Sequence, residues 1–179
     1  GSEMCIRDRF KIEGRADVEK LTSLPVVGDI PLADEKTGSI AVFENQNNLM
    51  SETFRNVRTN LQFMLENGKN VILVTSTISG EGKSFISANL AISLSLLGKK
   101  VVIVGLDIRK PGLNKVFNIP KKEHGITQYL TNTTANLMDF VQPSDINKNL
   151  FILPGGTVPP NPTELLARGG LEKAIETLK

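Results

Sequence analysis

The sequence of 179 residues predicts an α/β fold in which a parallel β-sheet is flanked by helices. Three short apolar runs are typical of buried strands, at 71–77, which is rich in β-branched residues, and at 101–104 and 150–153. Between the first two runs, residues 83–97 favour a helix that ends at Gly98. Strand, helix and strand in this order predict a right-handed βαβ unit over 71–104.

The N-terminal part is expected to form a leader and linker over 1–48, followed by the main domain over 49–179. Within the leader, 16–24 favours a short helix, and the proline-bounded stretch 25–31 favours extended backbone. From Ser51, a candidate N-cap, apolar residues recur every three or four positions until Gly68. This spacing predicts a helix that opens the domain.

The C-terminal part contains one helix signal before the third apolar run and two beyond it. The first helix is expected to begin near 125–130. Asn161 as N-cap, Pro162 in the first position and Glu164 two residues later form a strong helix start. A last helix carries Leu171, Ile175 and Leu178 on one face.

Composition narrows the function classes. A net charge of +2 with 22% charged residues argues against a nucleic-acid partner. The single cysteine excludes an internal disulfide and suits a reducing compartment. No apolar run approaches the ~20 residues needed to cross a bilayer, so we expect the chain itself to be soluble.

The stretch from the first apolar run into the next helix is typical of a phosphate-binding loop. An apolar strand, a small-residue loop and Gly-Lys-Ser at a helix start place backbone N–H groups around an anion. The residues expected to bind nucleotide are Ser79, Gly80, Glu81, Gly82, Lys83, Ser84 and Phe85. Thr77 departs from the motif, which has glycine there; a Ser/Gly-rich turn that ends in Gly-Lys-Ser by chance is the less favoured alternative.

The chemistry of these residue types predicts ATP and Mg²⁺ as ligands. Lys83 can reach the β- and γ-phosphates, and the Ser84 hydroxyl can ligate Mg²⁺. Asp107 follows the second apolar run, where a carboxylate beside a phosphate loop is well placed to hold the metal. The alternative for Asp107 is a loop residue paired with Arg109.

A charged triplet lies on the helix that opens the domain. Glu52, Arg55 and Arg58 are three residues apart and therefore share one face. Spacing alone favours a solvated face with a weak Glu–Arg ion pair.

The triplet, the loop STISGEGKS, the segment LDIRKP and the turn PPNPTELL occur here in one order. Together they resemble the cytoplasmic domain of the bacterial tyrosine kinases (BY-kinases), the P-loop kinases attached to polysaccharide co-polymerases. The resemblance runs from about residue 17 to the end and includes the piece PVVGDIP, which is similar to the family's linker after its second transmembrane helix.

The resemblance implies an ATP-dependent protein-tyrosine autokinase that regulates capsular or exopolysaccharide biosynthesis and export. It implies catalytic roles for Lys83, Asp107 and Arg109, and metal binding by Ser84 and Asp107. Glu52, Arg55 and Arg58 match the family's oligomerisation motif, so the partners would be neighbouring kinase subunits and a membrane co-polymerase or activator segment. The implied location is the cytoplasmic face of the inner membrane.

Two departures keep other functions open. Gly105 stands where the family usually has the first aspartate of its D-x-D-x-R motif, and no Walker B strand or tyrosine-rich tail is recognised before Lys179. We therefore expect residues 1–179 alone to have little kinase activity. One alternative is a partition-type P-loop ATPase, but those ATPases have a lysine at the position of Ile78, which argues against it. The other alternative is a non-catalytic nucleotide-binding module of the polysaccharide machinery.

Overall fold

The computed structural model describes residues 11–34, 37–65, 68–120, 124–132 and 134–179. Its sheet has the strand order β1-β3-β2, with β1 at Val101–Val104, β3 at Leu150–Leu153 and β2 at Gln142–Pro143. Strands β1 and β3 are parallel, with Val101 opposite Leu150, whereas β2 runs antiparallel to β3. The parallel pair is the centre around which the helices are arranged.

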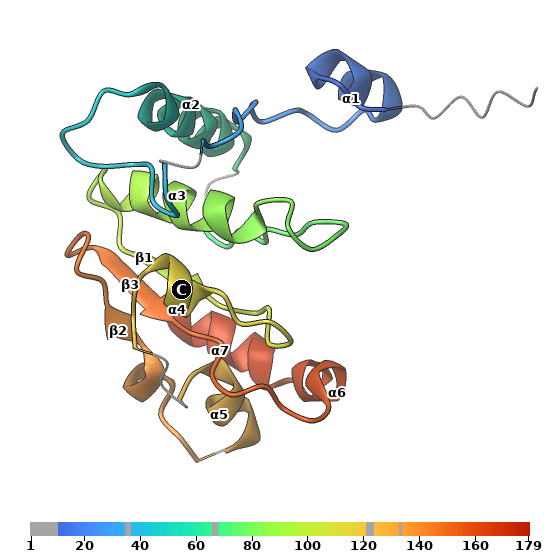
Figure 1. Cartoon of the computed structure of the whole chain (residues 1–179). Helices are drawn as coiled ribbons and strands as arrows, with labels where there is room; N and C mark the ends of the chain where they lie inside the picture. The colour runs from blue at the N-terminus through green and yellow to red at the C-terminus, as the bar shows by residue number, and fades with distance from the viewer. Residues whose placement is uncertain (1–10, 35–36, 66–67, 121–123, 133) are drawn as a thin grey trace, which may run out of the picture.

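Two stacked helices cover one face of the sheet. Helix α3 (Lys83–Ser95) lies against the strands, and α2 (Leu49–Met64) packs on the outer side of α3 (Figure 1). The short helix α4 (Leu113–Val116) also contacts α3. The core of this layer consists of buried apolar side chains, among them Phe54, Ile92, Ile103, Leu150 and Ile152. Burial of this apolar surface is the main favourable term holding α2, α3 and the sheet together.

The opposite face of the sheet carries the C-terminal elements. These are α5 (Ile126–Thr131), the 3₁₀ helix η1 (Leu137–Phe140), α6 (Pro162–Ala167) and α7 (Gly170–Leu178). Val102 and Val104 of β1 face this second core, while Val101 and Ile103 face the first. Alternate side chains of a strand point to opposite faces, so β1 contributes to both cores. Helix α1 (Arg15–Leu21) has no buried residue and stands apart from the layers (Figure 1).

The expected α/β class is confirmed, and most predicted elements are present. The runs 101–104 and 150–153 are strands with those bounds, and the helix expected at 83–97 is α3, which ends at Ser95. The helices expected near 16–24, at 125–130 and at the C-terminus correspond to α1, α5 and α7. The stretch 25–31 has no regular secondary structure, as expected for a proline-bounded segment.

The strand predicted at 71–77 is wrong for the described structure, and with it the βαβ unit over 71–104. These residues form no ladder with β1, β2 or β3. Val71 and Leu73 are 49% and 79% exposed. An apolar, β-branched run becomes a strand only when a neighbouring strand shares its backbone hydrogen bonds, and none of the described strands pairs with this run.

Three helix caps also differ from the prediction. Helix α2 starts three residues earlier than expected, because Asn48 is the N-cap in place of Ser51, and its Oδ1 accepts the N–H of Ser51 at 2.8 Å. At the other end, the C-cap is Leu65 instead of Gly68. Asn161 precedes α6 as predicted, but its side chain caps no backbone N–H group.

Asn89 links the connector before α2, residues 31–48, to α3. Its side chain is fully buried, and its Oδ1 accepts the N–H groups of Ala41 at 2.7 Å and Val42 at 3.1 Å. Its Nδ2 donates to the carbonyls of Ser39 at 3.1 Å and Phe85 at 2.8 Å. All four hydrogen bonds that an asparagine side chain can make are formed, so the connector is fixed against the middle of α3.

We expect Asn89→Leu to lower the free energy of unfolding by about 2–4 kcal/mol. The substitution leaves the buried N–H groups of Ala41 and Val42 without an acceptor, and each stranded group costs roughly 1–3 kcal/mol. Urea denaturation followed by circular dichroism measures this change. The exposed Asn70→Leu is the control and should change stability by about 0.5 kcal/mol or less. Equal unfolding midpoints for Asn89→Leu and the wild type would contradict this role.

Candidate phosphate-binding site

The loop before α3 has the backbone geometry of an anion site. Gly80 and Gly82 have φ values of 94° and 88°, which side chains with a Cβ rarely adopt. Gly82 is the N-cap of α3, and no side chain caps this helix start. A Cβ added at either glycine would meet nothing within 4 Å, so the space in front of the loop is open. The N–H groups and positive end of the helix dipole are therefore free to favour a phosphate.

Lys83 and Asp107 are brought together at this loop. The Lys83 Nζ atom lies 3.3 Å from Asp107 Oδ2, although the two residues are 24 positions apart in the sequence. The other carboxylate oxygen, Oδ1, accepts the backbone N–H of Lys110 at 3.1 Å. The ion pair of Asp107 is therefore with Lys83; Arg109, the partner weighed from the sequence, is exposed.

The residues present fit a magnesium ion shared with phosphates. A Cβ built at Gly112 would lie 3.6 Å from Ser84 Oγ, so the segment that follows Asp107 passes beside this hydroxyl. Within the part of the chain that the structure describes, no three His, Cys, Asp or Glu side chains cluster as a metal cage. Mg²⁺ commonly takes one or two protein oxygens and completes its shell with water and phosphate, which matches Ser84 and Asp107.

Gly105 has no room for the aspartate that the related motif carries. A Cβ at this position would lie 2.9 Å from the backbone nitrogen of Gly155 and 3.2 Å from Leu113 Cδ1. The N–H of Gly105 donates to the carbonyl of Leu153 at 2.9 Å, which holds the two strand ends close together. The absence of a carboxylate here is therefore built into the backbone packing.

Glu81 plays a part that the sequence analysis missed, because only its backbone was considered. Its carboxylate accepts the N–H groups of Thr77 at 2.9 Å and Ile78 at 3.2 Å, and the Thr77 hydroxyl at 3.0 Å. These hydrogen bonds lower the pKa of Glu81 below its usual value, and the bond from the Ile78 N–H has the largest effect. The sequence signal for this contact is Thr77, a hydroxyl residue four positions before Glu81. This spacing is too common in proteins to identify the contact.

The charged triplet on α2 is not one cluster. Arg55 Nη2 donates to the carbonyl of Gln46 at 3.0 Å and to Asn47 Oδ1 at 2.8 Å. Arg58 Nη1 reaches α3 and donates to the Ser93 carbonyl at 2.7 Å. Glu52 is exposed, and the Glu–Arg ion pair expected from spacing is not among the ion pairs of the described residues.

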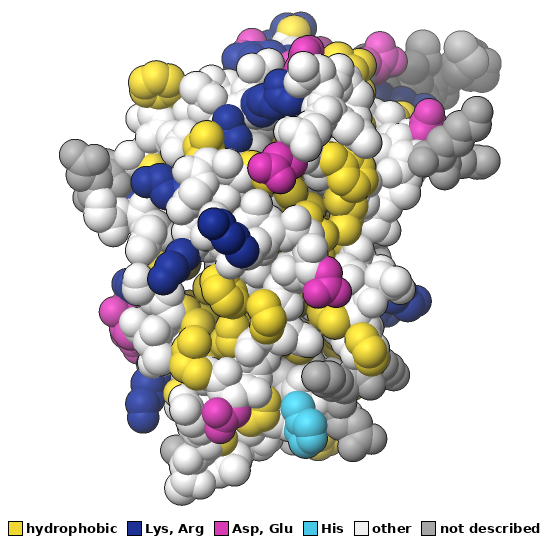
Figure 2. Space-filling model, turned by 90° about the vertical axis from the view of Figure 1, so that its left-hand side faces the viewer, with side chains coloured by type: hydrophobic (Ala, Val, Ile, Leu, Met, Phe, Trp, Pro, Cys, Tyr) yellow, Lys and Arg dark blue, Asp and Glu magenta, His cyan; other side chains and the backbone are white. Residues whose placement is uncertain are grey.

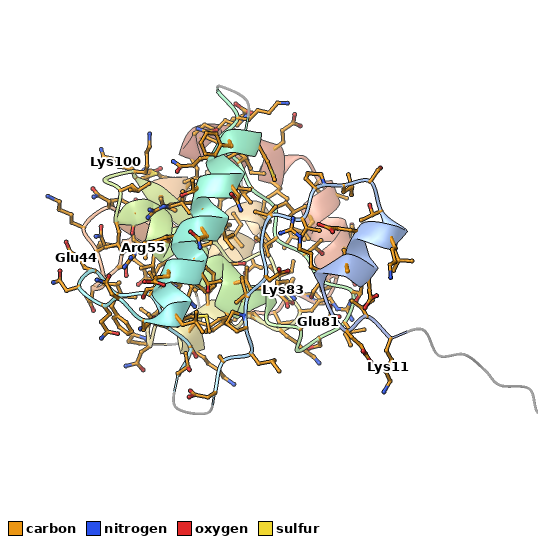
Figure 3. All side chains as sticks on the ribbon, turned by 90° about the horizontal axis from the view of Figure 1, so that it is seen from above. Lys11, Glu44, Arg55, Glu81, Lys83 and Lys100 are labelled. Atoms are coloured by element: carbon orange, nitrogen blue, oxygen red, sulfur yellow. The ribbon has the colours of Figure 1, made fainter. Side chains whose placement is uncertain are left out.

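The two arginines therefore have different surroundings. Burial, and secondarily the charge of Arg55, lowers the pKa of Arg58. Arg58 Nε is buried and has no hydrogen-bond partner in the structure. Figure 3 shows Arg55 on one side of α2, and Lys83 and Glu81 beyond its other side. In this view, Arg55 lies on the side of α2 away from Lys83 and Glu81.

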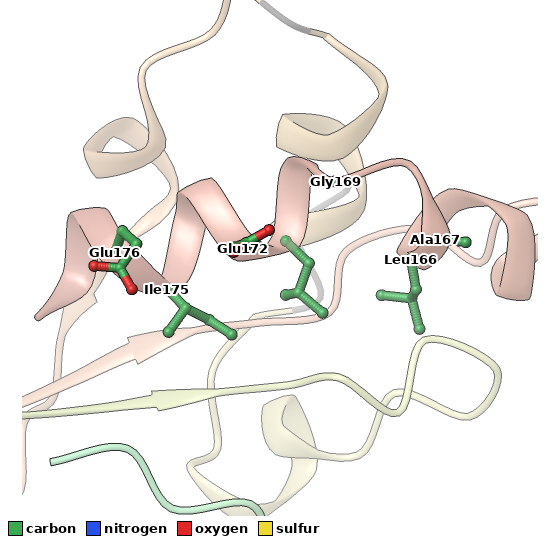
Figure 4. A pocket seen from close by; sticks show the side chains of 7 residues that line it. Leu166, Ala167, Gly169, Glu172, Ile175 and Glu176 are labelled. Carbon is green, nitrogen blue, oxygen red and sulfur yellow. The ribbon is translucent and has the colours of Figure 1, made fainter. Parts of the chain in front are cut away.

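Two cavities lie elsewhere on the molecule. A shallow one of about 380 Å³ between α6 and α7 is lined by Leu166 and Ile175, with Glu172 and Glu176 at its edge (Figure 4). The other, of about 450 Å³, lies between the connector 31–48 and the start of α2. Neither is lined by the phosphate loop, and the acidic edge of the first would repel a nucleotide. On the face in Figure 2, basic, acidic and hydrophobic side chains are interspersed.

Comparison with known proteins places this geometry in a family. Residues 67–152 match the family described as ParA, "NUBPL iron-transfer P-loop NTPase". The tyrosine-protein kinase CpsD of Streptococcus agalactiae is 37% identical over 128 residues, which cover 72% of this chain and 55% of that protein. The crystal structure of the chimerical protein CapA2B2 matches with a TM-score of 0.80 and 34% identity over 91% of this chain and 69% of that one. The chain belongs to the bacterial tyrosine kinase family.

Other matches of this family agree with the assignment. The BceF tyrosine kinase domain gives a TM-score of 0.79 at 30% identity and covers 93% of this chain and 72% of its own. The chain spans about half the length of the streptococcal kinase. Within the described residues, no helix combines the length and hydrophobicity required to cross a membrane.

We expect Gly105→Ala to destabilise the fold by about 1–3 kcal/mol. The added methyl group would lie 2.9 Å from a backbone nitrogen, and overpacking of this kind forces the strand ends apart. Thermal and urea unfolding measure the loss. Gly14→Ala is the matched control, because Gly14 has an extended φ of −173° and nothing within 4 Å of the new Cβ. A Gly105→Ala protein as stable as the control would refute the packing argument.

Proposed function

We propose that this chain carries the nucleotide-binding part of an ATP-dependent protein-tyrosine autokinase that regulates capsular or exopolysaccharide biosynthesis and export. The observation that supports it most is the phosphate loop with its two positive-φ glycines, directly followed by Lys83 in contact with Asp107. The solved kinase domains of the family share the fold at 30–34% identity.

Within this proposal, each residue has a separate task. Lys83 stabilises negative charge on the transferred phosphoryl group, and Asp107 holds the lysine ammonium at the loop. Ser84 and Asp107 offer oxygen ligands to Mg²⁺, which neutralises phosphate charge when it is bound with ATP. Arg109, exposed just after Asp107, is available to contact the phosphates. Phe85 contributes its backbone N–H in the first turn of α3.

The phosphate acceptor is a tyrosine hydroxyl of a neighbouring subunit. Tyr129, the only tyrosine of this sequence, lies half-buried on α5 and packs against the second core, which makes it a poor acceptor. We further propose that neighbouring subunits and a membrane co-polymerase or activator segment are the partners, at the cytoplasmic face of the inner membrane. No nucleic-acid partner is proposed.

A non-catalytic nucleotide-binding module is the second candidate, and the packing at Gly105 favours it. The backbone of Gly155 occupies the space that a first motif aspartate requires, so Asp107 is the motif carboxylate at the loop. The partition-type ATPase is less supported, because Ile78 presents an exposed aliphatic side chain where those proteins have a lysine. Labelled ATP added to the whole protein distinguishes the three: tyrosine labelling marks the kinase, DNA- or lipid-stimulated hydrolysis the ATPase, and binding alone the module.

We expect Lys83→Ala to weaken MgATP binding by about 10–100-fold. The substitution removes a charged donor from the loop, and a hydrogen bond to a charged group is worth roughly 1.5–3 kcal/mol. Isothermal titration calorimetry measures the affinity. Lys99→Ala, an exposed lysine just after α3, is the matched control and should bind as the wild type does. Equal affinity for Lys83→Ala and Lys99→Ala would count against a phosphate loop.

The assembly role of the α2 arginines requires two separate variants. Arg55→Ala is expected to yield monomers with little change in unfolding midpoint, because the hydrogen bonds of Arg55 to described residues go to the exposed connector. Arg58→Ala is expected to lower stability as well, because it removes the link to Ser93. Light scattering gives the mass, with exposed Arg168→Ala as the control. An unchanged oligomer mass for Arg55→Ala would show that this face of α2 is a solvated surface and not a subunit contact.

A further inference from the structure

The phosphate loop is closed by an internal contact between Thr77 and Glu81. The Glu81 carboxylate accepts two backbone N–H groups, from Thr77 at 2.9 Å and Ile78 at 3.2 Å. The Thr77 hydroxyl lies 3.0 Å from each carboxylate oxygen. Both ends of the segment 77–81 are therefore fixed to each other before any ligand is present.

This contact explains why threonine replaces the first glycine of the phosphate-loop motif. Among the described residues, Asn118 is the only non-glycine with a positive φ, so the backbone at Thr77 is in a conformation that any residue adopts. The conformational freedom of glycine is needed at Gly80 and Gly82 but not at 77. A threonine at 77 instead supplies the hydroxyl that contacts Glu81.

We propose that Glu81 is a positioning residue for nucleotide binding, which together with the Thr77 hydroxyl holds the loop in its phosphate-binding shape. The inference rests on the proposed function and extends it from the loop backbone to this side chain. Ordering a loop on binding costs conformational entropy, and a loop that is already closed avoids part of that cost. Glu81 itself touches no ligand in this role.

A carboxylate in an anion site also repels phosphate, and the structure indicates which effect is larger. The Glu81 side chain is exposed to solvent, so screening weakens its long-range repulsion. Its oxygens are occupied by three donors of its own loop, which compensate its charge locally. The loss of the closing contacts should therefore outweigh the relief of repulsion.

The first test is the affinity for MgATP, measured by calorimetry. Glu81→Ala is expected to weaken binding by about 5–10-fold, and Thr77→Val by less, because it removes only the hydroxyl contact and leaves the two backbone N–H groups bonded to Glu81. The double variant should bind no more weakly than Glu81→Ala, because that substitution already removes the hydroxyl contact. Thr77→Ser keeps the hydroxyl and should retain wild-type affinity. The exposed Glu172→Gln on α7 is the matched control. Tighter binding by Glu81→Ala and Glu81→Gln would show that repulsion dominates and would overturn the proposal.

The second test uses the ligand-free protein. In ¹H–¹⁵N spectra, the amide protons of Thr77 and Ile78 should shift upfield in Glu81→Gln and stay in place in Thr77→Ser and Glu172→Gln, because a carboxylate acceptor moves an amide proton downfield. If the wild type fails to bind MgATP, the proposed function fails, whereas these shifts still report the contact. If the wild type binds and neither affinity nor amide shifts respond to Glu81→Gln and Thr77→Val, the positioning role is refuted.

Discussion

The four hydrogen bonds of Asn89 are the constraint on which the placement of the phosphate loop depends. Helix α3 is the element that contacts α2, α4 and the sheet, and it begins with Lys83 and Ser84. Asn89 lies in the middle of this helix and binds the backbone of residues 39–42. Apolar packing alone is non-directional, whereas an unmet hydrogen bond at a buried amide is costly. The polar contact therefore selects one position of α3 among the many that its apolar residues would allow.

A second polar contact along α3 acts on α2. Ser93, one turn after Asn89 and fully buried, accepts from Arg58 and places α2 at a fixed angle to the helix that carries the phosphate loop. The family resemblance gives Arg58 an assembly role, while the structure shows it bonded inside its own chain. The two statements are compatible if Arg58 orients α2 and Arg55, whose bonds go to the connector, faces the neighbouring subunit.

Features set by local sequence could be predicted, and features set by distant partners could not. The strands 101–104 and 150–153, helix α3 and the loop with its two positive-φ glycines follow from short patterns of residue type. The run 71–77 begins with apolar residues like those strands, but it pairs with none of the described strands, and no local pattern reveals this. The partners of Asn89 in the connector are 47–50 residues away, so its role is invisible in the sequence. At the start of α2, Asn48 and Ser51 are both good caps, and only the structure shows which one is used.

The close backbone packing at the ends of β1 and β3 decides how charge is arranged at the site. Gly105 lies against the backbone of Gly155, and a Cβ at Gly125 would lie 2.3 Å from the carbonyl oxygen of Pro154. Because these glycines let three chain segments meet without side chains, the first residue able to present a carboxylate after β1 is Asp107. Under the proposed function, this one carboxylate would both hold Lys83 and serve the metal. A site with one carboxylate depends more on the shape of its loop than a site with two aspartates does. The contact between Thr77 and Glu81, which holds that shape in our proposal, is therefore important for nucleotide binding.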